Sequence, residues 1–318
     1  FQIAKCFRDE DLRADRQPEF TQLDLEMSFV DAEDVMGLID GLVAKTAKDV
    51  LGKEVKTPLP RMTFEEAMRR FGSDAPDLRF GMEIVDVTPV AKKTEFRVFR
   101  GTADSGGFVR GIAVKDAAAK YSRRQIDELT EYVKADFGAK GLAWFRVEED
   151  GSLWSPISKN FDAEHLAEIK ELLGGETGDL LMFLADSWDV TCKGLAGLRK
   201  RLASDLGLID PKELNCSWVT EFPMFDRDEE TGRWNAMHHP FTAPLESDLP
   251  SLKDNPQDCR AQAYDLVING SEAGGGTIRI HDQSSQSDVF ELLGIDAETA
   301  EDRFGFLLNA LKYGAPPH

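Results

Sequence analysis

A regular alternation of side chains near the start of the chain constrains its fold more than any other feature. A period of two predicts a β-strand with one apolar and one polar face. Residues 1–8 alternate more weakly and predict a first strand, which a charged loop joins to the second. The two strands predict a hairpin in an open antiparallel sheet, with one face on a core and one face in water. The second strand alternates Thr21, Leu23, Leu25, Met27 and Phe29 with Gln22, Asp24, Glu26 and Ser28.

The polar face of this hairpin has two interpretations. A surface hairpin with a solvated face would explain most patterns of this kind. Here the face carries few Lys or Glu side chains and holds Arg8, Gln22, Asp24 and Ser28 instead. These groups suit the floor of a binding site better than a surface that only contacts water.

Length and composition predict a globular protein of ordinary character. A chain of 318 residues suits two domains, or one domain with a large insertion. Hydrophobic residues make up 42% and charged residues 30%. No apolar run approaches transmembrane length and no signal peptide precedes the first strand, so no membrane partner is expected. Phe1 already lies within a strand pattern, which indicates a fragment of a longer protein.

The charge and the cysteines narrow the function classes further. A net charge of −20 disfavours nonspecific nucleic-acid binding, because neutralising phosphates needs clustered Lys and Arg. It leaves a local RNA contact open. The cysteines, Cys6, Cys192, Cys216 and Cys259, show no CxxC spacing. They predict neither a zinc site nor a disulfide framework, and they favour a reducing, cytoplasmic compartment.

Helices are expected after the hairpin. One begins at Asp31, and Gly52 is its expected stop. A second begins at Thr63, where T-F-E-E forms a capping box with Glu66, and Gly72 ends it. The turn-rich residues 72–80 mark a candidate domain boundary. We therefore expect residues 1–80 to form the first part of one domain.

Residues 81–210 have the texture of a separate α+β domain. Strands are expected at 94–99, 107–114, 142–147 and 179–185. Between them lie helices with recognisable caps, including a capping box of Ser122 and Gln125 and an N-cap at Asp162. About 130 residues of mixed strands and helices suffice for an independent domain. No cluster of His, Cys or carboxylates in this stretch indicates chemistry.

Residues 211–318 contain the chemically suggestive side chains. Asp265 and Glu272 are carboxylates close in sequence, and one or two carboxylates plus phosphate oxygens and water are what Mg²⁺ commonly uses. The glycines of 274–276 allow close backbone approach, although no P-loop pattern is present. His238 and His239 stand together before a proline, and a histidine pair alone is not a metal signature.

Arg279 lies between two isoleucines on an expected strand. Thr277, Arg279 and His281 share one face of that strand. An arginine on the inner face needs an anionic partner, because a buried unpaired guanidinium is costly. Its planar fork suits a carboxylate bidentately. An internal salt bridge and a bound carboxylate ligand are both compatible with this pattern.

Several segments together resemble one known family. FRDEDLRADRQPEFTQLD, residues 7–24, resembles motif 2 of the class II aminoacyl-tRNA synthetases, in the form found in bacterial-type aspartyl-tRNA synthetases. Residues 81–210 resemble the insertion that separates motifs 2 and 3 in the bacterial type, and HHPFTAP resembles the loop that closes over bound aspartate. The resemblance covers essentially the whole chain, from motif 2 to just before motif 3. It implies an α+β fold in which an antiparallel sheet flanked by helices, 1–80 and 211–318, is interrupted by a separate α+β insertion domain.

The resemblance implies roles for the nucleotide-binding residues. Arg8 corresponds to the family arginine that bridges the α-phosphate of ATP and the carboxylate of aspartate, and it is the expected catalytic residue. Glu10 and Gln17 match loop positions that contact ATP. Glu272 matches the glutamate beside ATP and its magnesium, and Asp265 is expected to hold Mg²⁺ with it.

The resemblance also implies an aspartate pocket. Arg279 corresponds to the arginine that receives the side-chain carboxylate of aspartate, and His238 to the family's histidine contact. His239 is the neighbouring candidate in the same loop. Arg8 completes the aspartate contacts. Asparagine should be rejected, because its neutral amide cannot satisfy the charge of the Arg279 guanidinium.

The implied activity is aspartate–tRNA ligation. ATP activates L-aspartate to aspartyl-adenylate with Mg²⁺, the aspartyl group passes to tRNA, and no tightly bound cofactor is expected. The intact protein is expected to be a homodimer. This stretch lacks motif 1 and motif 3, and by itself it is expected to bind ATP weakly or not at all and to form no adenylate.

Two alternatives remain open from the sequence. One is a related class II enzyme, such as an asparaginyl- or lysyl-tRNA synthetase or the ammonia-dependent asparagine synthetase. The large insertion, together with Arg279 and His238, argues against it. The other is a non-catalytic module that presents the insertion domain to tRNA or to a protein.

Overall fold

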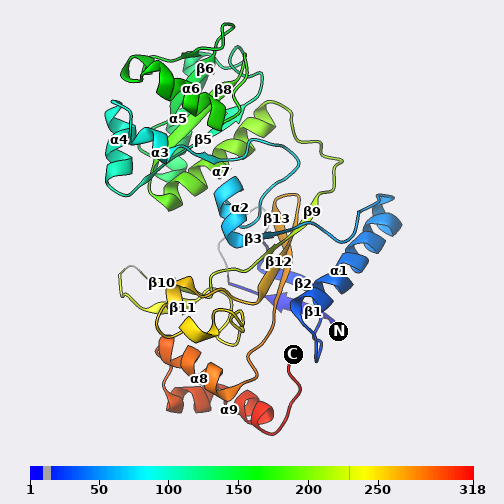
Figure 1. Ribbon diagram of the computed structural model, residues 1–318. Coiled ribbons are helices and arrows are strands. Elements are labelled where there is room, and N and C mark those ends of the chain that lie inside the picture. The colour runs from blue at the N-terminus through cyan, green and yellow to red at the C-terminus, as the bar shows by residue number, and fades with distance from the viewer. Residues whose placement is uncertain (10–15, 229) are drawn as a thin grey trace. The chain divides into compact units, whose positions relative to one another are not determined.

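The computed structural model describes residues 1–9, 16–228 and 230–318 (Figure 1). The chain divides into two compact units. Unit 1 comprises Phe1–Phe64 and Cys216–His318, and unit 2 comprises Glu65–Asn215. The sequence predicts boundaries after residues 80 and 210 instead. That the two units are a catalytic core and an insertion domain stays a prediction.

Unit 1 is built on a four-stranded sheet with the order β13-β12-β9-β3. β12 pairs antiparallel with both β13 and β9, whereas β3 pairs parallel with β9. Strands from both expected core segments therefore share one mainly antiparallel sheet. The strands are β3 (Arg61–Thr63), β9 (Cys216–Thr220), β12 (Ala263–Ile268) and β13 (Ser271–Thr277).

The N-terminal hairpin forms a sheet of its own. β1 (Gln2–Phe7) pairs antiparallel with β2 (Glu19–Asp24), and Ile3 lies opposite Leu23. The expected second strand reached Phe29, but Phe29 has a φ of 57°, in the left-handed region that a strand does not use. β2 ends earlier, at Asp24, which pairs with Gln2 at the start of β1.

The apolar face of the hairpin differs from the expectation in a second way. It was expected to pack on a core, yet the exposed fraction is 69% for Ile3 and 47% for Leu23. The alternation correctly indicates which side chains share a face. It contains no information on which element, if any, covers that face.

The first helix of unit 1 has the predicted ends. α1 (Ala32–Thr46) begins after the N-cap Asp31, which forms a capping box with Asp34. A π-helical turn, η1 (Ala47–Leu51), continues it to Gly52, whose φ of 67° ends the helix.

The C-terminal part of unit 1 surrounds a small aromatic cluster. Phe241, Phe290 and Phe304 are buried or partly buried together, with ring centroids 5.0–5.8 Å apart. Two helices contribute to this cluster, and a short antiparallel hairpin precedes them in the chain. The elements are β10 (Phe225–Arg227), β11 (Trp234–Ala236), α8 (Gln283–Leu292) and α9 (Ala297–Lys312), with 3₁₀ turns at Leu249–Ser251 and Pro256–Asp258.

Unit 2 contains a five-stranded antiparallel sheet with the order β4-β5-β8-β6-β7. β8 is buried along its whole length, because core clusters cover both faces of the sheet. Three of the four strands predicted here are confirmed. The strands are β4 (Val85–Asp86), β5 (Phe108–Val114), β6 (Ala143–Val147), β7 (Leu153–Trp154) and β8 (Leu180–Asp186).

The predicted strand at 94–99 is wrong. This segment leads into the helix α4, because Phe96, Phe99 and Ala103 recur at helical spacing and pack into the core. The capping box of Ser122 and Gln125 is confirmed. The helices of this region are α2 (Phe64–Phe71), α3 (Thr88–Ala91), α4 (Arg97–Asp104), α5 (Arg123–Phe137), α6 (Ala163–Leu172) and α7 (Trp188–Asp205), with a 3₁₀ turn at Ser158–Asn160.

Candidate active site

Arg8 leaves the end of β1 and remains exposed. Its backbone N–H donates to the carbonyl of Pro18 at 2.9 Å, so the two sides of the loop meet directly beyond the hairpin. Its guanidinium carbon lies 5.1 Å from the ring centroid of Phe20. Gln17, on the other side of the loop, is also exposed. Glu10 lies outside the residues that the structure describes.

The two carboxylates expected to bind metal lie on the same face of the four-stranded sheet. Asp265 pairs with Gly275, and Glu272 pairs with Val267. A bulge on β13 lies between these pairs, and the alternation along β12 puts residues 265 and 267 on one face. A Cβ on Gly275 would lie only 2.3 Å from Asp265 Oδ1. The glycine therefore leaves room for this carboxylate to lie over β13.

The chemistry of these carboxylates fits a hard divalent cation. Two carboxylates on one open face suit Mg²⁺ held together with phosphate oxygens and water. In the described ranges, no group of three or more His, Cys, Asp or Glu side chains could hold a metal ion. The site suits a metal that arrives with a phosphate ligand better than a protein-only cage.

Glu272 also forms an ion pair that was not expected from the sequence. Arg16 Nη2 donates to Glu272 Oε2 at 2.6 Å. The only sequence signal was the position of Arg16 next to Gln17 in the charged loop. Its partner could not be inferred, because the two residues are 256 positions apart.

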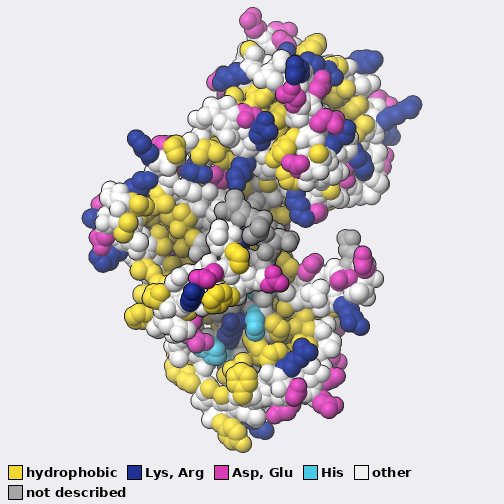
Figure 2. Space-filling model, turned by 180° about the vertical axis from the view of Figure 1, so that it is seen from behind, with side chains coloured by type: hydrophobic (Ala, Val, Ile, Leu, Met, Phe, Trp, Pro, Cys, Tyr) yellow, Lys and Arg dark blue, Asp and Glu magenta, His cyan; other side chains and the backbone are white. Residues whose placement is uncertain are grey.

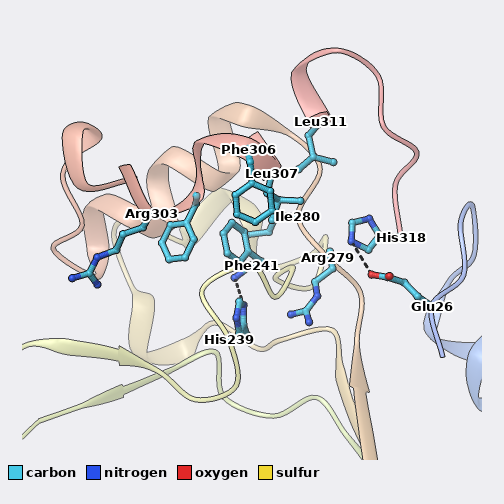
Figure 3. Close-up of a pocket in the computed structure, with 11 residues that line it drawn as sticks. Glu26, His239, Phe241, Arg279, Ile280, Arg303, Phe306, Leu307, Leu311 and His318 are labelled. Carbon is cyan, nitrogen blue, oxygen red and sulfur yellow. Dashed lines mark hydrogen bonds and ion pairs between the residues drawn. The ribbon is translucent and has the colours of Figure 1, made fainter. Parts of the chain in front are cut away.

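A cavity of about 400 Å³ lies beside Arg279 in unit 1 (Figure 3). In the space-filling view, histidine and basic side chains gather around a hollow in the lower part of the molecule (Figure 2). Arg279 and four other ionisable residues share the cavity with an apolar wall from α9. The lining residues are Glu26, His239, Phe241, Arg279, Ile280, Arg303, Phe304, Phe306, Leu307, Leu311 and His318.

Arg279 has unused hydrogen-bonding capacity in this cavity. Nη1 of Arg279 is buried, and no hydrogen-bond partner for it exists within the described residues. Burial lowers the pKa of Arg279, while the Glu26 carboxylate acts in the opposite direction. A desolvated guanidinium N–H is costly unless an anion meets it. The arrangement therefore suits an incoming carboxylate.

His239, rather than His238, lines the cavity. The His239 ring stacks on Phe241 with centroids 5.2 Å apart, and its Nδ1 accepts the backbone N–H of Phe241 at 3.3 Å. Burial and the charge of Arg279 lower the pKa of His239. The neutral ring therefore carries its proton on Nε2. Both histidines are exposed, and His238 contacts the Phe222 ring edge-on, with centroids 4.8 Å apart.

The C-terminal residues run between two parts of the site. The N–H of Phe29 donates to the Pro317 carbonyl at 3.0 Å, and the N–H of Arg279 donates to the His318 carbonyl at 2.9 Å. The His318 ring lies 3.4 Å from the Glu26 carboxylate, as Figure 3 shows. Glu26 and His318 were not predicted site residues. Glu26 could have been inferred from its place on the polar side of the alternation.

An α+β fold with a mainly antiparallel sheet, a candidate metal face and an arginine-lined cavity is consistent with a class II synthetase core. The chain belongs to the family of class II tRNA synthetases (D, K and N), whose pattern it matches over residues 1–318.

Several aspartate–tRNA ligases are similar in sequence to this chain. The chain is 80% identical over 317 residues to an aspartate–tRNA(Asp/Asn) ligase of Rhodopirellula baltica, covering 100% of this chain and 54% of the relative. It is 54% identical to an aspartate–tRNA ligase of Macrococcus caseolyticus and 55% identical to an aspartate–tRNA(Asp/Asn) ligase of Persephonella marina. All of this chain and 53% of each relative are covered. The chain thus spans about half the length of these relatives.

One solved structure and a search for membrane-spanning helices add two further findings. A solved aspartyl tRNA synthetase from Entamoeba histolytica aligns with 99% of this chain and 41% of its own at 14% identity, and its TM-score of 0.39 is too low to support an inference. Within the part of the chain that the structure describes, no helix combines the length and apolar character that crossing a membrane requires.

Proposed function

We propose that this chain forms the aspartate-activating part of an aspartate–tRNA ligase. Membership of the class II family and the names of its relatives support the reaction class. The observation that carries the substrate assignment is the buried Nη1 of Arg279, which lacks a partner among the described residues. A second carboxylate on the substrate, as in aspartate, would supply the missing acceptor.

The proposed chemistry needs positioning and charge neutralisation. The α-carboxylate of aspartate is ionised at neutral pH, so it can attack the α-phosphate of ATP without a general base, and pyrophosphate leaves. Arg8 would bridge the attacking carboxylate and the α-phosphate, which orients them and stabilises the developing charge. Gln17 and Glu10 would contact the nucleotide. Asp265 and Glu272 would hold Mg²⁺, which supplies neutralisation of phosphate charge.

Selection of aspartate over asparagine would depend on Arg279. The guanidinium fork matches a carboxylate, whereas a neutral amide would not neutralise the positive charge of Arg279. His239 lies in the same cavity with its Nδ1 already occupied. Its Nε2–H would be available as a donor to the substrate. His238 stays a second candidate through its place in the same loop.

The remaining assignments follow from the family. We propose tRNA as the acceptor of the aspartyl group, a homodimer as the intact form, and the cytoplasm as the location. Two of the relatives are named for both aspartate and asparagine tRNAs. Charging of both tRNAs by the intact protein is therefore worth measuring directly.

Aspartate-dependent exchange of pyrophosphate into ATP tests the proposal. The intact protein should catalyse this exchange with aspartate and Mg²⁺, and asparagine should support it only weakly. A folded intact protein that shows no aspartate-dependent exchange would overturn the assignment. Equal exchange with asparagine would instead overturn the role given to Arg279.

A further inference from the structure

The ion pair of Arg16 and Glu272 joins two distant segments of unit 1. Arg16 belongs to the loop between β1 and β2, and Glu272 is the second residue of β13. Their side chains are 34% and 38% exposed. A small ion in solution can therefore reach the pair without rearrangement of the core.

Arg16 and a divalent cation would compete for the Glu272 carboxylate. Its Oε2 accepts the 2.6 Å charge-assisted bond from Arg16. In the proposed function, the same carboxylate is one of two that hold Mg²⁺. A guanidinium and a divalent cation repel each other at short range, so binding of one at Glu272 opposes binding of the other.

We propose that Arg16 is a positioning residue that occupies Glu272 until a divalent cation replaces it. The guanidinium neutralises the carboxylate while the metal is absent, and it keeps a carboxylate of the Asp265 face in one orientation. The exchange breaks one ion pair and forms another, and no covalent bond changes. The metal rests on the proposed function, whereas the ion pair itself does not.

Mn²⁺ is a suitable probe, because electron paramagnetic resonance counts the free ion without any catalysis. In the intact protein, Arg16→Gln should tighten Mn²⁺ binding by roughly two- to fivefold, the range expected on removing a partly exposed competing pair. Arg16→Ala should act in the same direction. Arg16→Lys can still pair with Glu272 and should restore most of the original affinity.

Lys5 supplies a matched control on the same hairpin. Its Nζ lies 2.8 Å from Glu19 Oε1 in another exposed ion pair. Lys5→Gln removes the same unit of charge as Arg16→Gln but leaves Glu272 untouched. It should not change Mn²⁺ affinity, so a general effect of net charge can be separated from a local one.

A double-mutant comparison makes the test specific to Glu272. Glu272→Gln should weaken Mn²⁺ binding, and adding Arg16→Gln to it should have no further effect. Unchanged or weaker binding in Arg16→Gln alone would overturn the proposal. So would an equal gain with and without the Glu272 carboxylate, since Arg16 would then act elsewhere.

Pyrophosphate exchange separates this inference from the proposed function. A protein without aspartate-dependent exchange, in which Arg16 and Glu272 remain coupled in Mn²⁺ binding, would contradict the ligase assignment and leave the ion exchange standing. If the enzyme is active but substitution of Arg16 does not change its Mn²⁺ affinity, only the role of Arg16 is contradicted.

Discussion

The indole N–H of Trp218 donates a 2.7 Å hydrogen bond to the buried carboxylate of Asp40. Asp40 also accepts the backbone N–H of Leu59 at 3.1 Å, and its exposed fraction is only 3%. These bonds connect α1 to β9 of the four-stranded sheet. A buried carboxylate satisfied in this way fixes how the helix lies on the sheet that carries Asp265 and Glu272.

Replacing Asp40 should therefore destabilise unit 1. Asp40→Leu leaves the Trp218 and Leu59 donors buried without an acceptor, and the expected loss is about 2–4 kcal/mol. Asp40→Asn keeps one acceptor oxygen and should lose less. Urea unfolding measures both. Asp49→Ala breaks an exposed pair with Lys45, and its free energy of unfolding should stay within about 0.5 kcal/mol of that of the original protein. A loss as large as that of Asp40→Leu would contradict the role given to Asp40.

Arg279→Leu in the intact protein should abolish aspartate activation and leave ATP binding largely intact. Losing one partner of a desolvated charged pair costs on the order of 3–5 kcal/mol, which corresponds to a factor of roughly 150 to 4000 in kcat/KM for aspartate. Pyrophosphate exchange with aspartate and ATP varied separately measures this. Arg233→Leu is the control, because Arg233 is exposed just before β11. An unchanged aspartate KM in Arg279→Leu would show that Arg279 has a structural role instead.

Gly275→Ala tests the geometry of the carboxylate face. The added Cβ would meet Asp265 Oδ1 at 2.3 Å, so the carboxylate must move. The concentration of Mg²⁺ for half-maximal exchange should rise several-fold. Gly274→Ala is the natural control, because a Cβ there meets nothing within 4 Å and points to the opposite face. Similar effects of both substitutions would show that backbone freedom, and not Asp265, is responsible.

His239 should make stability fall at mildly acidic pH. Its pKa in the folded protein is lowered below the ordinary value of 6.5 by burial and by Arg279. The unfolded chain then binds the proton more readily. The stability from the neutral ring is present above pH 6.5 and is lost as pH falls below it. His239→Gln should flatten the dependence of Tm on pH between 5 and 7, and a parallel curve for the variant would refute this assignment.

Asp248 should contribute to resistance against stronger acid. Arg260 donates to it from Nε at 2.9 Å and from its backbone N–H at 3.0 Å. These bonds hold the pKa of Asp248 well below its usual range. Its contribution is present above pH 3.8 and is lost as pH falls further. Asp248→Asn should cost about 1 kcal/mol at pH 7 and little at pH 2, which urea unfolding at both values can compare; an equal cost would exclude the carboxylate charge.

Local patterns in the sequence were sufficient for much of the fold, whereas the roles given to the site residues stay predictions. The capping residues Asp31 and Ser122 mark helix starts correctly, because a cap depends on groups within one turn. Arg279 was expected on a strand, but β13 ends at Thr277 and Arg279 forms only an isolated antiparallel bridge with Thr242. It lies beside a cavity with its Nη1 buried, and its role toward a ligand stays a prediction.

Only the tertiary structure decided which distant groups meet. The pairing of Arg16 with Glu272 and the choice of His239 over His238 for the cavity depend on how strands and loops pack. The segment with Phe96 and Phe99 was wrongly predicted as a strand, because a short apolar segment contains too few residues for its periodicity to distinguish strand from helix. Periodicity and caps are set by neighbours in sequence. Pairing across hundreds of residues is set by packing, which no local pattern contains.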